Sequence, residues 1–157
     1  MELYPEQAPK SVAAFLSYVD AGYYKNSSFY RALNDENQPS GSGGIALLQG
    51  GTWKTKPELH QLPGIPHEST KETKILHKNG TVSLSRQAPG SASTEFFICV
   101  GDQSGFDFGG DNNPDGQGYA AFGRVVKGMD VVKEIHNQPV NGESLVTQVV
   151  IKNIEKL

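Results

Sequence analysis

The sequence contains almost no cysteine and has no long apolar run. Cys99 is the only cysteine, which excludes an intramolecular disulfide framework and a multi-cysteine zinc site and favours a small buried side chain over a reactive thiol. No stretch approaches the roughly 20 apolar residues of a membrane-spanning helix, and no charged-then-apolar leader precedes Glu2. Runs rich in Lys and Arg are also absent and the net charge is −3, so we expect no nucleic-acid binding and no membrane insertion.

Motifs of metal and hydrolytic chemistry are missing as well. The histidines do not form an H-x-x-x-H or H-x-E pattern, the G-x-S-x-G motif of hydrolases is absent, and no GK[ST] follows the GSGG at 41–44. The segment DNNPDG at 111–116 begins like a calcium loop, but Phe122 stands at its twelfth position, where a bidentate Glu is required. We interpret this segment as turns and expect neither a metal nor a cofactor.

The residues that are present indicate one turn-rich, strand-dominated domain over 1–157. There are 18 Gly and 9 Pro, and 36% of the residues are hydrophobic. The spacing of Val12, Phe15, Leu16 and Val19 predicts an amphipathic helix over 9–21, with Pro9 in its first turn. A second short helix is expected at 129–136.

Short apolar runs separated by turn signals predict the strands, at 27–31, 45–51, 80–86, 95–101, 119–126 and 145–155. Numerous short strands with one early and one late helix favour a mostly β fold, a closed or nearly closed antiparallel barrel capped by two helices. The strand SSFYR is expected to end at Arg31. The loop that follows, 34–44, is longer than usual and is therefore expected to be functional or mobile.

Several of these blocks, in this order, make the chain resemble the cyclophilins of divergent bacterial kind, which are peptidyl-prolyl cis/trans isomerases. The blocks are APKSVAAF at 8–15, SSFYR at 27–31, LLQGG at 47–51, GTVSLSR at 80–86, EFFI at 95–98 and AFGRVVKGMDVV at 121–132. The resemblance implies an eight-stranded barrel, but it begins within the family's second strand. We therefore expect an unpaired sheet edge beside 147–154, covered by another chain or by a local rearrangement, or else a weakened fold.

The resemblance also implies the site residues. Arg31 matches the family's main catalytic arginine, and Gln49 matches the glutamine that supports it and orients the substrate backbone. A guanidinium can donate to a prolyl nitrogen as the amide twists, so no nucleophile is needed. Without the resemblance, Arg31 would be interpreted as a surface ion-pairing residue and Gln49 as an ordinary loop amide.

A proline pocket is implied by further matches. Phe97 would form its floor and Leu47 its wall, although core packing explains these two equally well. The remaining expected substrate-binding residues are Ala46, Ser85, Phe106 and Tyr119.

Some positions depart from the family pattern. Ala46 replaces a phenylalanine of the pocket wall, and Glu95 adds a negative charge near the groove. In the family, a tryptophan that favours cyclosporin binding stands at a position that aligns near Gly105. The only tryptophan of this chain is Trp53, so we expect weak cyclosporin binding.

The leading hypothesis is an active isomerase that acts on proline-containing peptides and on unfolded or flexible client proteins. A catalytically weak proline-peptide-binding or chaperone-like module is the alternative, and a β-barrel that binds a ligand unrelated to proline is a third reading. Self-association through the exposed sheet edge is a further expectation. The protein is expected to be soluble, in the cytoplasm or the periplasm, and the sequence does not choose between them.

Overall fold

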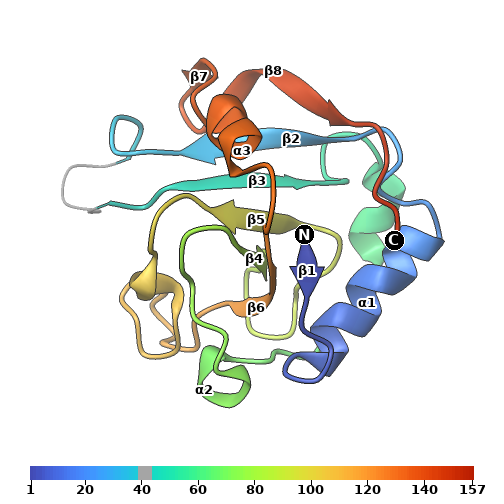
Figure 1. The fold of residues 1–157 in the computed structure, drawn as a ribbon, viewed down its shortest axis with the longest axis vertical. Coiled ribbons are helices and arrows are strands. Elements are labelled where there is room, and N and C mark those ends of the chain that lie inside the picture. Colours follow the sequence, from blue (N-terminus) through green and yellow to red (C-terminus); the bar gives the residue numbers. More distant parts are fainter. Residues whose placement is uncertain (39–43) are drawn as a thin grey trace.

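A computed structural model describes residues 1–38 and 44–157, so the SGSGG tip of the predicted long loop lies almost wholly outside the described residues. The strands form one antiparallel sheet in the order β1-β6-β4-β5-β3-β2-β8-β7, and its curvature is visible in Figure 1. Their bounds are β1 (Glu2–Leu3), β2 (Ser27–Leu33), β3 (Leu47–Gly51), β4 (Thr81–Leu84), β5 (Phe96–Cys99), β6 (Ala120–Arg124), β7 (Val140–Asn141) and β8 (Ser144–Ile151). The mostly β architecture predicted from the sequence is confirmed.

Both predicted helices are present, as α1 (Pro9–Asp20) and α3 (Met129–His136). A four-residue helix, α2 (Thr70–Thr73), and two 3-10 helices, η1 (Pro57–Gln61) and η2 (Ser104–Phe106), were not predicted because they are too short to show a periodic pattern. No helix among the described residues is long and apolar enough to cross a membrane.

The main core lies between α1 and the concave face of the sheet. Phe15 of α1 is 1% exposed, and its ring centroid lies 5.2 Å from Tyr24, 6.0 Å from Phe96 and 5.1 Å from Phe122. Aromatic side chains dominate core energetics because each buries a large apolar area. This cluster fixes α1 over one end of the sheet, to the right in Figure 1.

Strand β2 does not end at Arg31, so that prediction was wrong. The strand continues to Leu33 because Ala32 and Leu33 pair with Leu48 and Leu47 of β3, whereas its pairing with β8 ends at Arg31. A register shift between Phe29 and Arg31 inserts Tyr30 as an extra residue opposite β3. Such a bulge redirects the following side chain, and here that side chain is Arg31.

The two ends of the sheet are not paired with each other within 1–38 and 44–157. β1 pairs with β6, and β8 pairs with β2 and β7, which leaves the other edge of β8 beyond Val146 without a strand partner there. The open edge stays a prediction, and Val146 and Val150 of β8 are 64% and 60% exposed. Beside it, both termini and α1 line an apolar cavity of about 500 Å³.

Candidate active site

A row of side chains crosses four strands on one face of the sheet. Arg31 of β2 lies opposite Gln49 of β3, Gln49 lies opposite Phe97 of β5, and Phe97 lies opposite Ser83 of β4. Residues directly opposite each other share a face, and neighbouring strands are about 4.8 Å apart, so Arg31 and Phe97 are separated by roughly 10 Å. We call these four residues the cross-strand row. It brings a cation, an amide and an aromatic ring onto one rigid surface.

Hydrogen bonds hold the polar half of this row in one geometry. Arg31 Nη1 donates to Gln49 Oε1 at 2.7 Å, and Gln49 Nε2 donates to the Tyr30 hydroxyl at 3.0 Å. That hydroxyl donates in turn to Glu95 Oε2 at 2.6 Å. Burial, together with the nearby Glu95 charge, raises the pKa of Tyr30, so the phenol stays a donor to Glu95. Because every member has a partner on each side, the orientation of the Gln49 amide is fixed.

The Arg31 guanidinium has a second partner that sequence reasoning missed. Glu143 Oε2 accepts from Arg31 Nε at 2.8 Å and lies 2.7 Å from Nη2. Both side chains are partly exposed, at 35% and 42%, so the pair orders the guanidinium more than it stabilises the fold. Glu143 follows the turn at Asn141-Gly142. That Ser144 of β8 would pair with Arg31, and so place Glu143 beside it, could not be seen locally.

An apolar pocket floor adjoins the row. Its members Phe97, Phe106 and Tyr119 have ring centroids 5.2 to 5.5 Å apart, and the buried Leu47 belongs to the same cluster as Phe97 and Phe106. Phe97 meets Tyr119 nearly edge to face, at 87°, an arrangement that aromatic quadrupoles favour. The structure thus brings together four of the residues predicted for the pocket.

Arg86 closes one side of this floor and was also missed. Its side chain is only 1% exposed, its guanidinium lies 5.0 Å from the Tyr119 ring centroid, and Nη1 and Nη2 donate to the two carboxylate oxygens of Asp115 at 2.8 and 2.9 Å. Those bonds lower the pKa of Asp115. The pair therefore ties the turn segment 109–118 to the end of β4.

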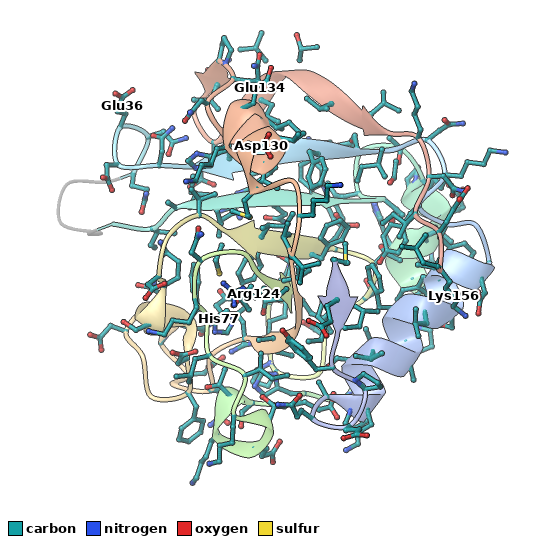
Figure 2. The ribbon with its side chains drawn as sticks, viewed as in Figure 1. Glu36, His77, Arg124, Asp130, Glu134 and Lys156 are labelled. Carbon is teal, nitrogen blue, oxygen red and sulfur yellow. The ribbon has the colours of Figure 1, made fainter. Side chains whose placement is uncertain are left out.

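A buried hydrogen-bonded triplet supports the floor from below. His77 Nδ1 lies 2.8 Å from Asp107 Oδ1, and His77 Nε2 lies 2.9 Å from Ser83 Oγ. The imidazole stacks at 14° to the Phe97 ring, with centroids 6.0 Å apart. The residue types match a serine hydrolase triad, but the His77 side chain is 0% exposed and Figure 2 shows it inside the molecule. Its role is structural.

The other predicted residues lie as follows. Ser85 lines a cavity of about 500 Å³ together with Arg31 and Gln49. Ala46 precedes β3, where its carbonyl accepts from the Val100 amide, and its role in the pocket stays a prediction. A Cβ on Gly105 would lie 2.4 Å from Asn112 Nδ2, so the turn segment occupies the space that a larger side chain would need.

Trp53 lies closer to the site than its place in the sequence indicated. It lines the same cavity as Arg31, although it belongs to the turn after β3. Its ring stacks on His60 with centroids 3.9 Å apart. Cys99 is fully buried and burial raises the pKa of its thiol, as expected for a structural cysteine.

Comparisons with known proteins agree with this geometry. The profile described as "Cyclophilin type peptidyl-prolyl cis-trans isomerase/CLD" matches residues 1–156. The peptidyl-prolyl cis-trans isomerase cyp18 of Streptomyces antibioticus is 34% identical over 137 residues, covering 86% of this chain and 75% of the relative. Peptidyl-prolyl cis-trans isomerase B of Escherichia coli (strain K12) is 33% identical over 143 residues, covering 86% and 76%.

Among solved structures, a cyclophilin type peptidyl-prolyl cis-trans isomerase of Cryptosporidium parvum, determined in the presence of the dipeptide Ala-Pro, matches the fold. Its TM-score is 0.73 at 20% identity, and the match covers 97% of this chain and 87% of that one. With a profile that spans nearly the whole chain and relatives that share a third of its residues, the chain belongs to the cyclophilin-type peptidyl-prolyl cis-trans isomerases.

Proposed function

We propose that this chain accelerates rotation about X–Pro bonds with Arg31 as the catalytic cation and Gln49 as its supporting group. The observation that carries the proposal is the cross-strand row, because it places a fixed guanidinium beside an apolar floor of the kind on which a proline ring can pack. The proline ring rests on the pocket floor, and the peptide backbone runs past Arg31.

The chemistry asked of the site is modest. Amide resonance gives X–Pro rotation a barrier of roughly 18–20 kcal/mol, and the resonance is lost when the nitrogen becomes pyramidal. The donors on Arg31 that Gln49 and Glu143 leave free interact with that nitrogen and with a substrate carbonyl. These bonds are stronger in the twisted state than in either planar isomer, so they lower the barrier without any covalent step.

Exchange spectroscopy by NMR on an Ala-Pro peptide tests the proposal. The enzyme is expected to produce cis–trans exchange on the millisecond timescale at catalytic concentrations, where the free peptide exchanges over tens of seconds or more. Peptide shifts without exchange would instead support the alternative, a weak proline-peptide-binding or chaperone-like module. The intact hydrogen bonds around Arg31 favour the enzyme.

Weak cyclosporin binding is part of the same proposal. Gly105 has no indole side chain that could contact cyclosporin at the edge of the pocket floor. The Asn112 side chain occupies the space in which a side chain on Gly105 would lie. Calorimetric titration is expected to give a dissociation constant above the micromolar range, and submicromolar binding would contradict this expectation.

Flexible or unfolded proteins with accessible prolines are the proposed clients. Self-association through the free edge of β8 is also proposed, because Val146 and Val150 are exposed there. Sedimentation equilibrium tests it, and a monomer at all concentrations would contradict it.

A further inference from the structure

The cavity beside Arg31 lies next to the pocket floor, whose residues Leu47, Phe97, Phe106 and Tyr119 are not among those that line it. It measures about 500 Å³, and its lining residues include Trp53, His60 and Glu95. Glu95 directly precedes β5, two residues before Phe97, so its position lies roughly 7 Å along the sheet from the row. A side chain two or three residues from a bound proline can reach that distance.

The Glu95 carboxylate is held rigidly by hydrogen-bond donors. Oε1 accepts from the backbone amides of Thr52 at 2.7 Å and Trp53 at 3.0 Å, while Oε2 accepts from the Tyr30 hydroxyl. A Cβ on Gly51, whose φ is +142°, would lie 2.5 Å from Oε2, so this close approach of carboxylate and backbone requires glycine. The structure therefore builds a defined position for one negative charge.

That charge has no cationic partner in the part of the chain that the structure describes. The two arginines that line the cavity are each paired with another carboxylate, Arg31 with Glu143 and Arg86 with Asp115. No Lys, Arg or His within 1–38 and 44–157 forms an ion pair with Glu95. When these two ion pairs are counted as neutral, Glu95 leaves one uncompensated negative charge in the cavity.

An aromatic pair flanks this end of the cavity. The Trp53 and His60 rings stack at 14°, and His60 Nε2 lies 3.0 Å from the Trp53 backbone carbonyl, which orients the imidazole against the indole. Trp53 is nonetheless 48% exposed, so one face of the pair is open to a ligand. Indole faces attract ammonium and guanidinium groups, and guanidinium also stacks on them.

We propose that Glu95, with Trp53 and His60, forms a subsite for a lysine or arginine side chain of the substrate, which makes this isomerase selective for basic proline-containing segments. The proposal rests on the proposed function, since it names the substrates of the same site. Glu95 supplies the opposite charge and the stacked rings hold the stem or the guanidinium plane.

Matched peptides test the proposal. Each contains one Ala-Pro and carries Lys, Gln or Glu at the second or third position on either side of the proline. For the wild type we expect kcat/KM to be about fivefold higher for the best Lys peptide than for its Gln counterpart, and lower for the Glu peptide. The Lys-to-Gln ratio is expected to fall toward one as salt is raised to about 1 M.

The variants separate this subsite from general effects. Glu95→Gln is expected to remove the Lys preference, whatever it does to overall turnover, because the readout is a ratio within one variant. Asp20→Asn removes an exposed charge on α1, outside the residues that line this cavity, and is expected to keep the ratio. Trp53→Ala is expected to reduce the ratio in part.

A ratio near one in the wild type, or a ratio that Glu95→Gln leaves unchanged, would overturn the subsite while leaving the isomerase intact. If no peptide is turned over at all, the proposed function fails instead. Calorimetric dissociation constants for the Lys and Gln peptides then decide the subsite independently.

Discussion

Replacement of Arg31 by alanine is expected to lower kcat/KM for X–Pro rotation by about 100-fold or more. Removing a positioned donor from a charge-stabilising site typically costs this much, and no other free donor cation lies in the cross-strand row. The loss should appear mainly in kcat, since the proline ring still rests on the pocket floor. The measurement is the exchange rate of an Ala-Pro peptide as a function of enzyme and peptide concentration.

Two further variants show whether geometry or charge is responsible. Arg31→Lys keeps the charge but loses the planar fork that bonds both Gln49 and Glu143, so activity should fall almost as far. Glu143→Gln keeps a hydrogen-bond acceptor for the Arg31 guanidinium and should lower kcat/KM only a few-fold. Arg31→Ala with unchanged turnover and an unchanged melting temperature would refute the catalytic role.

Replacement of His77 by alanine is expected to lower the free energy of unfolding by about 3 kcal/mol or more. The change leaves a cavity and removes a partner from both Asp107 and the fully buried Ser83. Urea denaturation measures the loss. Because the imidazole stacks on Phe97, the dissociation constant for proline peptides should rise as well.

His67→Ala is the matched control for this prediction. His67 is half-buried and its Nε2 contacts only the Gln117 carbonyl, so the change should alter stability much less, by about 0.5 kcal/mol. If His77→Ala does not fold, Ser83→Ala removes a single hydrogen bond of the triplet and should cost about 1–2 kcal/mol. A loss below 1 kcal/mol for His77→Ala would show that the triplet contributes little.

Local patterns predicted the elements well because their causes are local. The period of Val12, Phe15 and Val19 gave α1 within one residue of its C-terminal end, and the interval 129–136 matches α3. The predicted strands are all present, but their ends were misplaced by one to four residues. At Arg31 the error had a clear source, since pairing of Ala32 and Leu33 with Leu48 and Leu47 of β3 extends β2 by two residues.

The candidate site was predictable only where the resemblance supplied it. Arg31, Gln49 and the pocket floor were proposed by matching motifs, and their common sheet face follows from the register. Glu143, Arg86 and the His77 triplet were missed because their partners lie far away in the sequence or on turns without periodic signals. Glu95 was noticed as a negative charge, but its donors and the nearby Trp53–His60 pair emerge only in three dimensions.

The cross-strand row and the segments outside the strands that border the site differ in how freely they can change over evolution. The row is embedded in four hydrogen-bonded strands, where a substitution disturbs the whole sheet. The Trp53–His60 pair and the turn segment 109–118 lie outside the strands, held by side-chain contacts. Exchanging the Trp53–His60 segment together with Glu95 between relatives should transfer peptide preference while leaving the rotational chemistry in place, so one scaffold can acquire new clients through residues outside the strands.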